Sequence, residues 1–327
     1  IPGSRKTHET RFWLAQVLYE QGNLEEALRE QTRGLEQDST NGREHYKRGF
    51  VLHRLDRLPE AVSEYEKAIQ LSPENFMPYT SLGDLLFSLG GKERGEQLLL
   101  KAAELAPLSP LPCFTLARCL SGQRRHDDAI AHYEKAVERW KPGDKAVERW
   151  GPGAGAALWL ADFGTCLRAK GRNAEAAECY EKAVAAFEKM PERKRRELSN
   201  WDMGVVLDAY AILARDAAAA GNEQLARQIT QKLLEILQRI VAAPEAEATH
   251  LNHYAWTLLT CEIEDLRDPK SALPLAKRAV ELTHEQDFAS LDTLALALFL
   301  TGDVARAVAT SKKALGLLPP PSPDDGT

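Results

Sequence analysis

The sequence contains no long apolar run. No stretch reaches the roughly 18–20 residues that a helix needs to cross a lipid bilayer, so a direct membrane span is not expected. No signal-peptide pattern follows Ile1. We therefore expect a cytoplasmic location, with the periplasm as the alternative.

Cysteine is scarce, and no two cysteines form a CxxC pair. An odd number of irregularly spaced cysteines argues against both a disulfide framework and a zinc site. We expect buried free thiols in a reducing compartment. The five cysteines are Cys113, Cys119, Cys166, Cys179 and Cys261.

The common catalytic signatures are missing as well. The sequence has no GxxxxGK phosphate loop, no GxSxG elbow and no HExxH helix. His250 and His253, one turn after Glu247, would supply only half of a metal site, and surface or packing roles explain them better. We predict no catalytic residue, no cofactor and no metal, and hence no enzyme.

The overall charge is also unfavourable for one class of ligand. A net charge of −6 argues against a nucleic-acid binder held by bulk charge. Hydrophobic residues make up 44% of the chain and charged residues 28%, which is an ordinary balance for a folded protein with a sizeable core.

What the sequence does contain is an internal repeat. Ala27, Ala61, Gly95 and Ala129 follow one another at steps of 34 residues. A second column of small residues lies twelve residues upstream and a third lies seven residues downstream. The second column is Ala15, Gly49, Gly83, Ala117, Gly164 and Ala214, and the third is Gly34, Ala68, Ala102, Ala136 and Ala183.

Packing explains why these positions are small. The side chains at a helix crossing set the distance between two helices, so alanine or glycine allows a close approach. We expect the first two columns to join the two helices of one repeat. The third column is expected to join the second helix to the first helix of the next repeat.

The turns fit the same pattern. Gly22, Gly171, Gly221 and Gly302 each offer a left-handed stop, and the residues that follow can cap the next helix. Prolines then end the second helix of several repeats. These prolines are Pro73, Pro107 and Pro319.

With an aromatic residue four positions after Ala61, Ala129 and Ala176, the pattern resembles the tetratricopeptide repeat in its bacterial type. The resemblance covers roughly residues 8–320, although the first-helix tryptophan of the family is mostly absent. It implies an all-α, right-handed superhelical solenoid of about eight helix–turn–helix repeats with a concave peptide-binding face. The middle repeats are irregular.

The departures from the period divide the chain. Residues 1–140 hold four regular repeats, and residues 141–198 hold a duplicated loop, a fifth repeat and a charged linker. The loop arises because KAVERWKPGD is followed directly by KAVERWGPGA. Residues 199–246 form an irregular repeat of two long helices, residues 247–319 two C-terminal repeats, and residues 320–327 a disordered tail.

The second long helix carries an apolar face. Ordinary core packing is the favoured explanation for this face, and a homodimer seam is the alternative. Its residues are Leu225, Ile229, Leu233, Ile236, Leu237 and Ile240.

The resemblance also implies which residues line the concave face, because positions 2, 5, 9 and 12 of each first helix point inward in this family. Aromatic residues and arginine recur there, and protein interfaces are enriched in both. Packing of several rings against neighbouring repeats is an equal alternative. The predicted peptide-binding residues are Phe12, Tyr19, Arg43, Tyr46, Phe50, His53, Arg54, Asp84, Phe87, Phe114, Arg118 and Arg168.

We therefore predict a non-catalytic interaction scaffold that binds a protein or peptide segment with apolar anchors and acidic character. The Lys and Asn clamp of chaperone-binding relatives is missing, since Phe12, Gln16, Tyr46 and Phe50 stand at its positions. The alternative function is a regulatory or substrate-docking part of a larger enzyme or membrane protein.

Overall fold

A computed structural model describes residues 4–140, 155–190, 195, 200–243 and 246–318. Within these ranges the chain is all-α, with sixteen α-helices, one short 3-10 helix and no strand. The predicted fold class, a solenoid of eight helix pairs, is confirmed.

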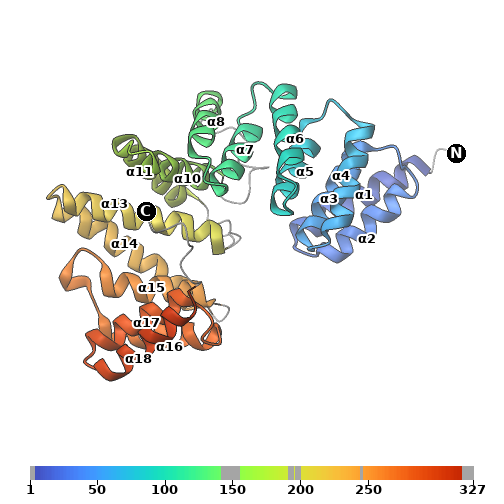
Figure 1. Ribbon diagram of the computed structural model, residues 1–327. Helices are drawn as coiled ribbons and strands as arrows, with labels where there is room; N and C mark the ends of the chain where they lie inside the picture. The colour runs from blue at the N-terminus through green and yellow to red at the C-terminus, as the bar shows by residue number, and fades with distance from the viewer. Residues whose placement is uncertain (1–3, 141–154, 191–194, 196–199, 244–245, 319–327) are drawn as a thin grey trace. The chain divides into compact units, whose positions relative to one another are not determined.

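The first four pairs follow one another along the chain in antiparallel hairpins (Figure 1). They are α1 (Ser4–Glu20) with α2 (Leu24–Leu35), α3 (Gly42–Arg54) with α4 (Leu58–Leu71), α5 (Phe76–Ser88) with α6 (Lys92–Leu105), and α7 (Leu111–Gly122) with α8 (His126–Arg139).

The remaining four pairs continue the same arrangement with longer helices in the middle. They are α10 (Ala156–Ala169) with α11 (Asn173–Lys189), α13 (Asn200–Ala219) with α14 (Glu223–Val241), α15 (Ala248–Thr260) with α16 (Pro269–Leu282), and α17 (Phe288–Leu300) with α18 (Val304–Gly316). The 3-10 helix, Glu264–Leu266, lies between α15 and α16.

The chain forms two compact units, residues 1–151 with 165–172 and residues 152–164 with 173–327. Inside the first unit the second helix of each pair packs on the first helix of the next, as α2 does on α3, α4 on α5 and α6 on α7. Inside the second unit α11 packs on α13, α14 on α15 and α16 on α17. In a solenoid, each repeat contacts only the repeats next to it in the sequence.

The small residues lie at the helix crossings as the sequence predicts. A Cβ atom added at Gly49 would stand 2.7 Å from the Tyr65 ring of the same repeat. At Gly83 it would stand 2.7 Å from Leu99 Cγ and 3.0 Å from the carbonyl oxygen of Gly95. The 2.7 Å distances are shorter than real Cβ contacts and the 3.0 Å distance is tighter than most, so glycine is what allows these helices to touch.

One small residue has a different role from the one expected. The spacing predicts that Gly34 lies where one repeat contacts the next. A Cβ atom there would stand 2.4 Å from the ring of Phe12. Phe12 belongs to α1, the first helix of the same repeat, and its ring fills the space that Gly34 leaves. The third column therefore also packs within its own repeat.

The turns between paired helices use the left-handed backbone region at the same repeat position. Gly22 and Gly90 have φ of 84° and 87°, and Gly171, Gly221 and Gly302 also have positive φ. In the second and fourth repeats the position is held by Asp56, with φ 58°, and by Arg124, with φ 60°. A residue with a Cβ atom is strained in this region, and aspartate tolerates it better than arginine does.

Replacing Arg124 by glycine is therefore expected to stabilise the first unit by about 1 kcal/mol, because the left-handed strain disappears. The greater chain entropy of glycine in the unfolded state offsets part of this gain. Urea denaturation followed by circular dichroism measures the change. As the matched control, Gly90→Ala introduces a Cβ atom at the same turn position and should destabilise. A lower midpoint for Arg124→Gly would contradict the strain argument.

The apolar face of the long-helix repeat packs within the chain. Leu233 and Leu237 of α14 are 1% and 0% exposed, whereas Leu225 is 42% exposed. Core packing therefore accounts for the buried part of the face. A homodimer through this repeat stays a prediction.

Three predicted features fall outside the described residues. They are most of the duplicated loop, most of the charged linker and the tail. Within the described part of the chain, none of the helices combines the length and apolar character needed to traverse a membrane.

Candidate peptide-binding groove

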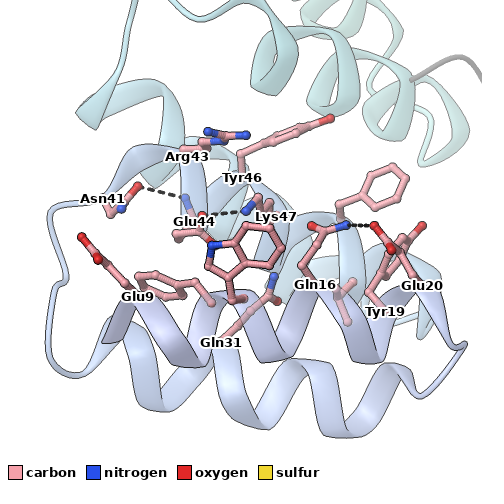
Figure 2. Close-up of a pocket in the computed structure, with 14 residues that line it drawn as sticks. Glu9, Gln16, Tyr19, Glu20, Gln31, Asn41, Arg43, Glu44, Tyr46 and Lys47 are labelled. Atoms are coloured by element: carbon pink, nitrogen blue, oxygen red, sulfur yellow. Dashed lines mark hydrogen bonds and ion pairs between the residues drawn. The ribbon is translucent and has the colours of Figure 1, made fainter. Parts of the chain in front are cut away.

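A groove of about 710 Å³ lies between α1 and α3, two successive first helices (Figure 2). Five of the twelve predicted binding residues line it. They come from inward positions of both helices, so the repeat register brings together residues that are about 30 positions apart in sequence. These five are Phe12, Tyr19, Arg43, Tyr46 and Phe50.

The aromatic residues of the groove form a connected cluster. The ring centroids of Tyr19 and Phe50 are 5.8 Å apart in an edge-to-face arrangement, and those of Tyr46 and Phe50 are 6.5 Å apart. Tyr46 in turn lies 5.9 Å from Tyr65, which is fully buried between α3 and α4. The chain of rings fixes the groove floor to the core of the second repeat.

Burial separates the predicted rings into two groups. Phe12, Tyr46 and Phe114 are 7%, 4% and 1% exposed, so they support the inner surface from within. Burial raises the pKa of Tyr46 to about 12, which keeps its hydroxyl protonated at neutral pH. Tyr19 and Phe50 are half-buried and line the groove.

The predicted charged residues are largely engaged with one another. Arg118 on α7 forms an ion pair with Asp84 on the preceding first helix, α5, and Arg54 donates a hydrogen bond to the Tyr19 hydroxyl at 3.4 Å. Burial lowers the pKa of His53, despite the opposing charge of Asp84, so its ring is neutral at pH 7.

The other predicted residues do not line the groove. His53, Arg54, Asp84, Phe87, Phe114 and Arg118 belong to α3, α5 and α7 but lie outside it, and Arg168 lies on α10.

Several lining residues were missed by the sequence argument. Trp13 is 73% exposed, and Lys47 stands at the same repeat position on α3. Both directly follow an inward position, so the helical period could have marked them. Glu9 and Gln16 also line the groove and stand at inward positions of α1, and the other missed residues are Glu20, Gln31, Asn41, Glu44 and Val51.

Two of these residues had no sequence signal at all. Gln31 on α2 is 3% exposed and Glu44 on α3 is 5% exposed, yet both line the groove. Among the described residues, neither the Gln31 Oε1 atom nor the Glu44 Oε2 atom has a hydrogen-bond partner. Figure 2 shows Glu44 and Gln31 between the two helices that form the walls. A buried acceptor without a donor is costly, so a ligand that supplies donors would be stabilised here.

One histidine of the candidate half-site contacts a neighbouring helix. His253 Nε2 lies 3.6 Å from Asp208 Oδ1 on α13, and burial lowers the pKa of His253. In the part of the chain that the structure describes, no group of three or more His, Cys, Asp or Glu side chains could hold a metal ion.

Family models described as tetratricopeptide repeat match residues 8–30, 42–75 and 113–189. No curated protein matches the chain in sequence. With these matches and the eight helix pairs, the chain is a tetratricopeptide-repeat protein.

Solved structures share the fold at low sequence identity. PilF of Pseudomonas aeruginosa is 16% identical with a TM-score of 0.55, and the match covers 72% of this chain and 93% of that one. PilW, a widely conserved type IV pilus biogenesis factor, is 15% identical with a TM-score of 0.53, over 73% and 96% of the two chains. YrrB, a tetratricopeptide-repeat protein with an unusual peptide-binding site, is 24% identical with a TM-score of 0.39, over 55% and 86%.

Proposed function

We propose that the chain is a non-catalytic interaction module that binds a segment of a partner protein in the α1–α3 groove. The observation that carries this proposal is the groove itself. It is open, about 710 Å³ in volume, and lined by five aromatic side chains from two adjacent repeats. Rigid aromatic anchors in a concave site are the usual centres of binding energy at protein interfaces.

An extended or single-helical segment suits this geometry. The walls are helices held by core packing rather than by loops, so the groove is formed before a ligand arrives. Preorganisation of this kind lowers the entropic cost of binding. Apolar anchors of the partner would contact Trp13 and the partly exposed rings of Tyr19 and Phe50.

The acidic character expected of the partner has weaker support than the apolar anchors. That expectation rested on the arginines of the concave face, yet Arg118 is paired with Asp84. Arg43 is the predicted arginine that lines the groove. It occupies the same repeat position on α3 as Glu9 occupies on α1.

The double variant Trp13→Ala/Phe50→Ala tests the site. We expect it to lose partner binding by about tenfold or more, because two hot-spot rings are removed. Partners captured from lysate by the wild-type chain would be identified by mass spectrometry. The affinity of each purified partner for both proteins would then be measured by calorimetry.

The matched control is Leu108→Ala/Phe299→Ala. It removes two exposed apolar side chains, 87% and 58% exposed, that do not line the groove. The control should bind as the wild type does, and circular dichroism must show both variants folded. Equal affinities for the groove variant and the wild type would place the binding site elsewhere and refute the proposal.

A further inference from the structure

Acidic side chains outnumber basic side chains in the lining of the α1–α3 groove. Three carboxylates line it, those of Glu9, Glu20 and Glu44, against the two cations Arg43 and Lys47, which leaves a net charge of −1. Lys47 is already paired within the chain, since its Nζ donates a hydrogen bond to Glu44 Oε1 at 2.7 Å. Apart from this pair, the carboxylates of Glu9 and Glu20 face the single lining cation Arg43, so the net charge of the lining is −1.

Two buried polar atoms of the groove favour a ligand that donates hydrogen bonds. Glu44 Oε2 and Gln31 Oε1 are both acceptors, and both lack a donor among the described residues. Glu44 and Gln31 are 5% and 3% exposed, so their side chains must turn toward the groove before a ligand can reach these two atoms. A ligand with N–H or O–H groups can donate to both atoms, whereas a carboxylate has no donor and would be repelled by Glu44.

Aromatic surface completes the arrangement. Trp13 lines the groove with 73% of its surface exposed, and tryptophan is the best partner for a cation lying over a ring face. Carboxylates next to an exposed aromatic face form the general chemistry by which proteins bind ammonium and guanidinium groups.

We propose that the groove recognises a basic segment, and that a lysine or arginine side chain of the partner enters between α1 and α3. Its charged end donates to Glu44 Oε2 and Gln31 Oε1, while its methylene stem lies along Trp13. Glu9 and Glu20 at the rim attract the flanking positive charge. This inference rests on the proposed function and names the partner class as basic rather than acidic.

A random dodecapeptide library displayed on phage and selected on the wild-type full chain tests the inference. We expect lysine and arginine to be enriched at one position beside apolar residues, and aspartate and glutamate to be depleted. One enriched peptide would then be synthesised with lysine, norleucine or glutamate at that position for calorimetry. Norleucine keeps the stem and removes the charge, so it separates the two contributions.

Variants of the groove give the quantitative check. Glu9→Lys/Glu20→Lys should weaken the lysine peptide about tenfold, since like charges replace opposite ones at the rim. Trp13→Ala should weaken it about fivefold, because the methylene stem loses its contact with the indole ring. The matched control Glu25→Lys/Glu26→Lys makes the same change in net charge on exposed positions of α2 outside the groove, and it should leave affinity unchanged.

The possible failures are distinguishable. Groove-dependent peptides that are acidic or uncharged, or equal affinities for the lysine and norleucine peptides, would overturn the basic-segment inference and leave the proposed function standing. Equal loss in the groove and control charge variants would mean that only net charge matters, which also overturns it. If no selected peptide depends on Trp13 and Phe50, both proposals fail.

Discussion

Replacement of Gly83 by leucine is expected to lower the free energy of unfolding of the first unit by about 3 kcal/mol. The Cβ atom of any side chain there would lie 2.7 Å from Leu99 Cγ and 3.0 Å from the Gly95 carbonyl oxygen. The second neighbour is backbone and cannot rotate away. Reciprocally, a Cβ atom at Gly95 would lie 2.8 Å from the Gly83 carbonyl oxygen, so α5 and α6 touch through their main chains.

Urea denaturation followed by circular dichroism would measure the loss of unfolding free energy. Hydrogen exchange would show which helices are destabilised. Because solenoid repeats contact only their neighbours, the weakened protection should centre on α5 and α6 and fade along the stack. The matched control is Gly122→Leu, at the end of α7, where a Cβ atom meets nothing within 4 Å. If Gly83→Leu and Gly122→Leu melt alike, the proposed helix crossing is wrong.

The second large effect is expected at a buried pair of polar side chains on α3 and α4. His45 Nδ1 lies 2.7 Å from Glu64 Oε2, and the two side chains are 7% and 5% exposed. His45 Nε2 lies 3.1 Å from the Ser39 carbonyl oxygen.

We expect His45→Ala to destabilise the chain by about 3 kcal/mol, because it leaves the Glu64 carboxylate buried with weaker partners. The remaining partners are Lys67 at 3.1 Å and Arg48 at 3.8 Å. The exposed pair Arg57 and Glu60, 2.7 Å apart, provides the control, and Arg57→Ala should change stability little. Equal effects of the two substitutions would contradict the importance of burial.

The same pair predicts an acid dependence. Burial acts to raise the pKa of Glu64, but the hydrogen bond from His45 and the charge of Arg48 outweigh it and lower that pKa below 4.5. A lowered folded-state pKa stabilises the fold above pH 4.5, and the contribution is lost as the pH falls through the folded value. Denaturation midpoints measured from pH 7 to pH 3 should fall more steeply for the wild type than for His45→Ala. Parallel curves would show that the pair does not control this pH response.

The repeat architecture could be predicted from the sequence because it depends on local and periodic features. The 34-residue spacing of small residues fixed the register, and the glycines at turns marked where helices stop. The two long helices expected within residues 199–246 correspond to α13 and α14. Each signal is repeated in several places, so an irregular repeat did not obscure it.

The depth of each concave-face side chain could not be predicted in this way. Phe12 is buried because Gly34 opens a space for its ring, and Tyr46 is buried because it packs on Tyr65. Both depend on how closely two helices approach, a quantity that helical spacing does not contain.

The sequence alone thus determined the eight helix pairs and their register, and five of its twelve predicted binding residues line the α1–α3 groove. Tertiary structure decided which side chains are buried and which are paired. It paired Arg118 with Asp84, which are 34 residues apart, and left an acceptor atom of Glu44 without a donor. The reason is that charge pairing and burial depend on distances between helices, whereas periodicity specifies only which face a residue occupies.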